Sequence, residues 1–208
     1  MSYIFSAIEL VAALIGTWCF HKMTVPIHRY FLFFLWYTFL VEISNALLKD
    51  FFNVDISWIY EIYTVTSFLF YFYWYYFILK QKIFRQIIII CALLFIMVTI
   101  IVELFPEQMA GRGFAFVTGT AGLLTVIFLH FYTLLTGDGI QIVKYKLSFW
   151  VSTALLLFYI GIIPLMLLSS YLSIEQLGYF IILMALNIIL YGCYVIGFIW
   201  MKKEYNRF

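Results

Sequence analysis

Seven apolar stretches, separated by short polar segments, dominate this chain of 208 residues. They span roughly residues 3–20, 30–48, 56–79, 86–104, 114–135, 147–170 and 176–201. Each is long enough for a helix that crosses the hydrocarbon core of a bilayer, which takes about 20 residues at about 1.5 Å per residue. The connections are too short for another folded unit. The sequence therefore predicts an all-α bundle of seven transmembrane helices that forms one domain over residues 1–208.

The composition excludes the soluble classes of protein. Hydrophobic residues make up 66% of the chain and charged residues 11%, whereas an ordinary soluble domain has about half and about a quarter. So few charged groups cannot cover the surface of a soluble fold. Soluble enzymes and nucleic-acid-binding proteins are excluded on this ground. The first apolar stretch has no basic segment before it and contains Glu9, so we expect it to be retained as a span rather than removed as a signal peptide.

Basic residues are concentrated in alternate loops. Ten of the 12 lysines and arginines fall in the first, third and fifth loops and after the last helix, whereas Lys49 and Arg112 fall on the opposite side. Because basic loops stay on the cytoplasmic side, we expect the N-terminus outside and the C-terminus in the cytoplasm of a multi-pass protein of the cell inner membrane. Acidic residues of the opposite loops agree with this orientation: Asp50, Asp55, Glu107 and Glu175.

Catalytic and cofactor-binding motifs are absent from the sequence. It contains no C-x-x-C, H-E-x-x-H or G-x-S-x-G pattern, and its three histidines and three cysteines are dispersed. The last apolar stretch has no lysine near its middle to hold a retinal. We therefore expect a protein that is not an enzyme and that holds neither a cofactor nor a metal.

Three carboxylates inside the predicted spans, Glu9, Glu42 and Glu61, are the main candidates for a functional site. A charge at bilayer depth costs about 2.5–3.5 kcal/mol and usually faces the protein interior. Helical geometry places all three about 8–9 Å below the outer boundary. Polar neighbours at helical spacing, Asn45 and Thr64 among them, predict one outward-opening site for a cation, a proton or an amine, with Glu42 at its centre. The alternative is three separate carboxylates that form their own hydrogen bonds or extend to the outer interface.

Residues of the later helices suggest how the bundle packs. Gly119 and Gly122 form a small-residue face that permits close helix contact. Pro164 predicts a bend in the sixth helix, because it cannot donate a backbone hydrogen bond. Asn187 and Tyr191, one turn apart, are expected to form hydrogen bonds within the bundle. We expect the aromatic third helix at the centre and the aliphatic fourth helix against lipid.

Four short motifs resemble one known group of proteins. They are Glu42 late in the second predicted helix, Trp58-Ile-Tyr60-Glu-Ile-Tyr63-Thr64, Ser148-Phe149-Trp150, and Asn187-x-x-x-Tyr191. The chain as a whole resembles small seven-helix membrane proteins that are common in Bacteroidota and have no established activity. The resemblance implies the fold but no substrate. Members of that group tend to carry a glutamate at the position of Ser67, whereas this chain has Glu61 instead.

Three classes of function fit these features. A sensory or regulatory membrane protein fits the absence of catalytic groups, the outer carboxylates and the basic cytoplasmic face, which could dock a soluble protein partner or anionic lipid. A small-solute or ion transporter or channel also fits, with the fourth helix as the linker of a 3+1+3 arrangement. A membrane enzyme is the third class. We predict the sensory or regulatory class, embedded in the lipid bilayer, and leave open whether the chain forms a homo-oligomer.

Overall fold

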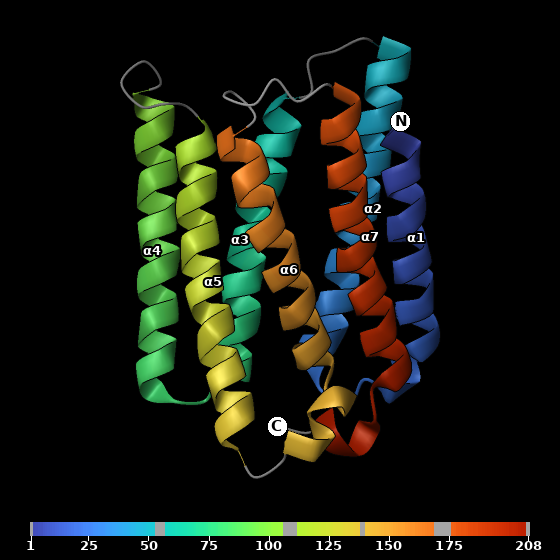
Figure 1. The fold of residues 1–208 in the computed structure, drawn as a ribbon, viewed down its shortest axis with the longest axis vertical. Helices are drawn as coiled ribbons and strands as arrows, with labels where there is room; N and C mark the ends of the chain where they lie inside the picture. Colours follow the sequence, from blue (N-terminus) through green and yellow to red (C-terminus); the bar gives the residue numbers. More distant parts are fainter. Residues whose placement is uncertain (1, 53–56, 106–111, 138–139, 169–175, 207–208) are drawn as a thin grey trace.

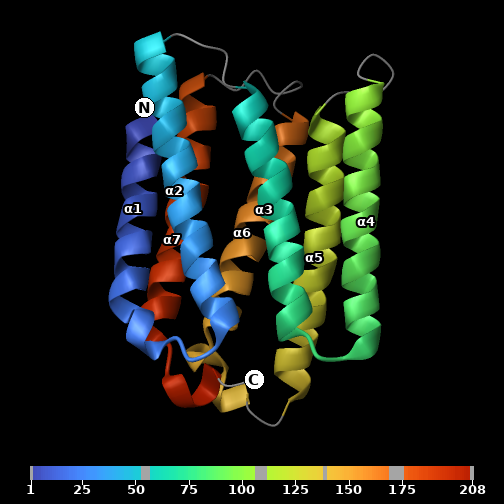
Figure 2. The ribbon, with the colours of Figure 1, turned by 180° about the vertical axis from the view of Figure 1, so that it is seen from behind.

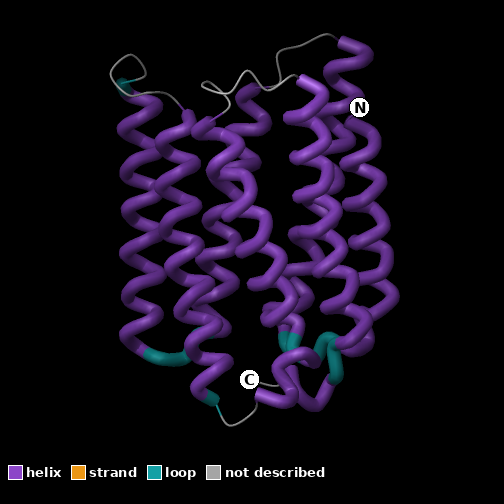
Figure 3. Tube along the Cα trace, in the orientation of Figure 1, coloured by secondary structure: helices purple, strands orange, loops and turns teal. Residues whose placement is uncertain are grey.

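The computed structural model describes residues 2–52, 57–105, 112–137, 140–168 and 176–206. Within these ranges the chain forms seven α-helices and three short 3-10 helices, and contains no strand (Figure 3). The predicted all-helical fold with seven long helices is confirmed. Six of the helices are long and apolar enough to cross a membrane, as expected for a multi-pass membrane protein.

The helices match the predicted apolar stretches closely. In chain order they are α1 (Ser2–Trp18), η1 (Cys19–Lys22), α2 (Pro26–Phe52), α3 (Ser57–Ile78), α4 (Lys82–Leu104), α5 (Arg112–Thr136), η2 (Ile140–Tyr145), α6 (Leu147–Leu168), α7 (Gln176–Trp200) and η3 (Lys203–Asn206). The largest differences are at α2 and α4, each of which begins four residues before the stretch predicted for it. Their first turns hold polar residues, which an apolar run does not mark.

The α-helices run side by side between two ends of the bundle (Figure 1). We call the end at which α1 begins the N-terminal end, and the end that holds η1, η2 and η3 the C-terminal end. Helix α1 packs against α2 and α7, α6 joins α7 to α5, and α3 joins α2 to α5 (Figure 2). Helix α4 packs against α3 and α5 at the edge of the bundle and exposes a row of apolar side chains that includes Ile90, Leu93, Met97 and Ile100.

Helix α3 lies between α2 and α5 and buries one face in the bundle, whereas Ile62, Tyr73 and Phe77 on its other side are exposed. It contacts α2, α4 and α5, and its side chains also reach α6 and α7. The rings of Phe68 and Tyr159 lie 5.6 Å apart, and the hydroxyl groups of Tyr71 and Tyr194 lie 3.1 Å apart. Of the seven α-helices in the described ranges, α3 is the one that is not among the six long and apolar enough to cross a membrane. Its many tyrosines and tryptophans lower its mean hydropathy, although their rings pack as apolar surface.

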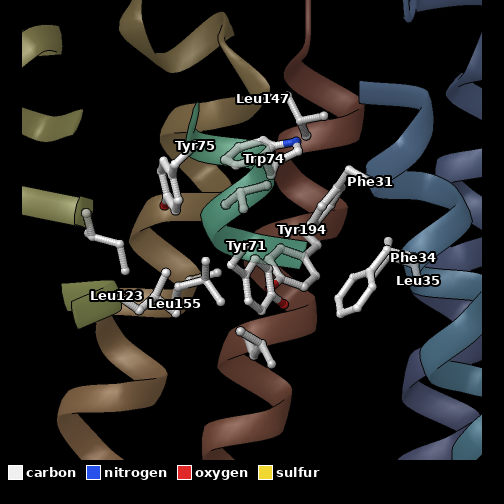
Figure 4. Close-up of a cluster of buried hydrophobic side chains, with 14 of the residues drawn as sticks. Phe31, Phe34, Leu35, Tyr71, Trp74, Tyr75, Leu123, Leu147, Leu155 and Tyr194 are labelled. Carbon is white, nitrogen blue, oxygen red and sulfur yellow. The ribbon is translucent and has the colours of Figure 1, made fainter. Parts of the chain in front are cut away.

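Aromatic rings fill the middle of the bundle (Figure 4). Phe31 of α2 packs edge-on against Tyr194 of α7 at 5.1 Å, and Phe34 packs edge-on against Tyr71 of α3 at 5.3 Å. Trp74 of α3 is fully buried beside Phe31. These contacts tie α2, α3 and α7 together in the half of the bundle toward the C-terminal end.

Glycines set the closest approaches between helices. A Cβ atom on Gly119 would lie 2.9 Å from ring carbons of Phe95, and one on Gly122 would lie 3.2 Å from Cβ of Cys91. Helix α5 therefore contacts α4 through its small-residue face. In the α6–α7 contact, a Cβ atom on Gly197 would lie 2.8 Å from Cβ of Trp150.

Each of the three helix connections at the C-terminal end has a hydrogen bond of the same type. In each, a side-chain N–H donates to the backbone carbonyl six residues earlier. The pairs are Arg29 to Met23 at 3.2 Å, Arg85 to Leu79 at 2.9 Å and Trp150 to Lys144 at 2.8 Å. Each bond joins a side chain in the first turns of one helix to a backbone carbonyl just before that helix. It therefore fixes how the segment before the helix enters it. These bonds hold the basic residues of this end in defined places.

Candidate functional site

The buried carboxylate of Glu9 is the centre of a polar cluster in the N-terminal half of the bundle. Glu9 comes from α1 and is only 6% exposed. Its Oε1 atom accepts a hydrogen bond of 2.9 Å from the hydroxyl of Tyr191 on α7. Its Oε2 atom is buried and has no hydrogen-bond partner among the described residues. A buried carboxylate with one satisfied oxygen is costly unless a proton or a cation balances it.

Helix α2 brings a second carboxylate to this cluster. Glu42 is half-buried and lies close enough to Glu9 for the two groups to interact electrostatically. The hydroxyl of Tyr60, on α3, interacts electrostatically with Glu42. Asn45 is fully buried, and neither Oδ1 nor Nδ2 of its side chain has a hydrogen-bond partner among the described residues. The hydroxyl of Tyr63, one turn along α3, donates to Thr38 at 3.5 Å. Four helices, α1, α2, α3 and α7, therefore supply polar groups around two neighbouring carboxylates.

The third carboxylate has different surroundings. Glu61 lines a cavity of about 350 Å³ between α3, α4 and α5, together with Thr64, Thr99 and Glu103. The Thr64 hydroxyl donates to the carbonyl of Tyr60 within α3 at 2.7 Å. Most of the remaining lining is apolar, including Val65 and Phe116.

The structure thus divides the predicted site into two places. Glu9, Glu42 and Asn45 belong to the α1–α2–α3–α7 cluster, whereas Glu61 and Thr64 belong to the cavity beside α4 and α5. The reason is rotation about α3. Glu61 lies on the face that continues to Phe68, which packs against Phe95 of α4. The neighbouring face of α3 carries the tyrosines that point toward α2 and α7.

Three further polar contacts lie deeper in the bundle. The hydroxyl groups of Tyr71 and Tyr194 are 3.1 Å apart. The hydroxyl of Ser152 on α6 lies 2.7 Å from that of Tyr75 and 2.8 Å from Nδ1 of His130. All five side chains are buried. Polar contacts therefore continue through the aromatic middle, from α7 to α3 and from α3 through α6 to α5.

The predicted packing residues have distinct places. Gly119 and Gly122 lie in the contact of α5 with α3 and α4. Pro164 lies inside α6, which continues on both sides of it. Asn187 donates to the carbonyl of Leu183 in its own helix at 2.8 Å. Among the described residues, only Tyr191 of the predicted pair forms a hydrogen bond that crosses between helices.

Sequence reasoning missed the most strongly connected polar side chain at the C-terminal end, Asn206. It is buried, and its Nδ2 atom donates to the carbonyls of Tyr145 at 2.8 Å and Lys202 at 2.7 Å. Its Oδ1 atom accepts a 3.0 Å bond from the amide of Leu147, the first residue of α6. Asn206 therefore satisfies one of the amides that a helix start leaves free. Neither its spacing nor its neighbours mark this role in the sequence.

Metal ligands do not gather in the described part of the chain. No group of three or more histidine, cysteine or acidic side chains is close enough there to hold a metal ion. The cysteines Cys19, Cys91 and Cys193 are free thiols.

Comparison with models of protein families, with curated proteins and with solved structures gives no match for this chain. The resemblance to seven-helix proteins of Bacteroidota stays a prediction, and function has to be argued from the site itself.

Proposed function

We propose that this chain is a non-catalytic inner-membrane protein with seven spans, whose N-terminus lies outside and whose C-terminus lies in the cytoplasm. The seventh span is α3. Its 22 residues correspond to about 33 Å of helix, enough for the hydrocarbon core. It lies among the other helices along much of their length (Figure 2).

The distribution of charge supports this orientation. Nine of the ten basic residues expected in the cytoplasm lie in the described ranges, and all nine are at the C-terminal end: Lys22, Arg29, Lys80, Lys82, Arg85, Lys144, Lys146, Lys202 and Lys203. Four residues used in the sequence argument, Asp55, Glu107, Glu175 and Arg207, lie outside the described residues. A C-terminal fluorescent fusion should be bright and a C-terminal alkaline phosphatase fusion inactive. The opposite pair of results would reverse the orientation.

The function that fits best is sensory or regulatory, with a proton or a small cation as the signal. One observation carries this proposal: the carboxylate of Glu9 is buried, and one of its oxygens has no partner among the described residues. Glu42 is close enough to interact with it electrostatically. Two neighbouring carboxylates in a low-dielectric bundle favour uptake of a proton or a cation. Through Tyr191, the state of Glu9 acts directly on α7, which continues to the C-terminal end. A cytoplasmic protein partner would receive the signal there.

The filled middle of the bundle favours this class over a transporter or channel. Rings of α2, α3 and α7 contact one another in the interior, in the half of the bundle toward the C-terminal end (Figure 4). A permeating solute would have to displace them. The alternative, a transporter with the 3+1+3 arrangement, would need these side chains to separate in another conformation.

Hydrogen exchange of the protein in nanodiscs tests the proposal. Lowering the pH or adding sodium or methylammonium should change exchange in residues 198–206, and Glu9→Gln and Glu42→Gln should abolish that change. Glu103 is an exposed carboxylate toward the N-terminal end of the bundle, so Glu103→Gln is the matched control. This variant should keep the change in exchange. Unchanged exchange in the native protein would contradict the sensory proposal. Cation or proton flux into proteoliposomes that is lost in Glu9→Gln would favour the transporter.

A further inference from the structure

The C-terminal end of the bundle contains a second, basic cavity. Its volume is about 660 Å³, and it is lined by residues from three separate parts of the chain: η1, η2, and the last turn of α7 with the segment that follows it. Four lysines line it, Lys22, Lys144, Lys202 and Lys203, with Glu204 as the acidic residue among the lining. Four positive charges and one negative charge leave a net formal charge of +3. Like charges repel, so such a cluster favours an anion between them.

Specific contacts hold the lysines in place. The Lys22 ammonium donates to the carbonyl of Ile199 on α7 at 3.0 Å. The Lys202 ammonium lies 4.2 Å from the centre of the Tyr145 ring. Asn206, through the carbonyls of Tyr145 and Lys202, ties η2 to the end of the chain. The cavity is therefore a built feature of the fold, because hydrogen bonds of Lys22 and of the buried Asn206 fix the segments that carry its charges.

Apolar side chains adjoin the basic cavity on the side of the bundle. Trp200 is 47% exposed and Ile199 is 52% exposed, and both line the cavity. Trp18, at the end of the neighbouring helix α1, is 81% exposed. Tryptophan is typical of the level at which lipid headgroups meet acyl chains. An anion in this cavity would therefore have an apolar surface of α1 and α7 directly beside it.

We propose that this cavity binds the phosphate of an anionic lipid headgroup, with the acyl chains against the exposed apolar residues of α1 and α7. The lysines supply the charge that recognises the phosphate, and Trp18, Ile199 and Trp200 supply the surface that distinguishes a lipid from a soluble phosphate. This inference requires that the helices span a membrane and is independent of the sensory role.

Native mass spectrometry of the full chain, with phosphatidylglycerol as the anionic probe and phosphatidylcholine as the neutral one, tests the proposal. Lys144 and Lys203 are exposed, so Lys144→Gln/Lys203→Gln removes two charges from the cavity. A lysine near an anionic lipid surface contributes about fivefold in affinity, so the double variant should bind phosphatidylglycerol about twentyfold more weakly. Lys80→Gln/Lys82→Gln removes two exposed lysines from the α3–α4 connection at the same end and should bind as the native protein does.

Three results would overturn the proposal. Equal loss of phosphatidylglycerol in the two double variants would mean a diffuse effect of charge. If the native protein retained phosphatidylcholine as well as it retains phosphatidylglycerol, the site would not select an anion. Binding of glycerol phosphate as tight as that of phosphatidylglycerol would mean a soluble phosphate ligand. Melting temperatures without lipid verify that each variant is folded, and Lys203→Glu, a single change, provides the same comparison if the double variant is not.

Discussion

The close contact of α5 with α3 and α4 gives the sharpest test of the fold. We predict that Gly119→Leu and Gly122→Leu destabilise the bundle. At Gly119 even the first added carbon would lie 2.9 Å from the ring of Phe95 and 3.1 Å from that of Phe68. Both rings are about 1% exposed and pack against each other at 5.0 Å, so neither has free space to move into.

The expected size follows from two opposing effects. Overpacking a filled core costs about 1–3 kcal/mol, whereas replacing a helical glycine by leucine recovers up to about 1 kcal/mol of helix propensity. Gly192 in α7 is the matched control, because a Cβ atom there would meet nothing within 4 Å. Gly192→Leu should therefore gain helix propensity without the cost of overpacking. The two α5 variants should be less stable than this control by about 1–3 kcal/mol.

Thermal unfolding in one detergent measures the difference. For a chain of this size 1 kcal/mol corresponds to about 2–4 °C in Tm, so Gly119→Leu should melt at least about 2 °C below Gly192→Leu. Gly122→Leu should fall between them, because its nearest neighbour is 3.2 Å away rather than 2.9 Å. Equal melting temperatures for all three variants would refute the packing of α5 described here.

Three further substitutions test buried hydrogen bonds. Tyr191→Phe removes the donor to Glu9 and should lower stability by about 1–3 kcal/mol. Thermal unfolding should show a smaller loss when the same change is made in the Glu9→Gln variant. Asn206→Ala should speed hydrogen exchange at the first amide of α6, because that amide loses its acceptor, while exchange in the middle of α6 stays unchanged. Ser152→Ala leaves Nδ1 of His130 without its partner and should cost about 1–3 kcal/mol; a stability equal to that of the native protein would contradict the contact.

The fold was predictable because the bilayer limits what an apolar chain can form. A helix satisfies its own backbone groups, so long apolar runs identify spans without knowledge of their neighbours. The position of α4 at the edge of the bundle also follows from composition. Its many isoleucine, leucine and valine side chains need no polar partner inside the bundle, so they can face lipid. The boundaries were less predictable. Arg29 and Arg85 belong to helix starts because their side chains bind carbonyls six residues earlier, and hydropathy does not register such contacts.

The direction in which each candidate carboxylate faces was not predictable from the sequence. Counting residues along each helix gave Glu9, Glu42 and Glu61 a common level, but the level does not fix which way each side chain faces. One residue along a helix corresponds to about 100° of rotation, so the direction depends on which neighbours α3 has. The neighbours are set by packing, such as that of Phe68 against Phe95. A single sequence does not contain that information.

Helix α7 connects the two polar regions of the bundle. Near the middle of α7 Tyr191 donates to the buried carboxylate of α1, one turn further on Tyr194 meets Tyr71 of α3, and at the C-terminal end Ile199 accepts from the lysine of η1 that lines the basic cavity. A helix transmits a shift along its axis more readily than a chain of loose contacts does, because its backbone hydrogen bonds are continuous. Coupling between two sites is reciprocal in binding free energy. If the proposed cation or proton at Glu9 moves α7, an anionic lipid in the basic cavity must therefore change the affinity of Glu9 by the same factor.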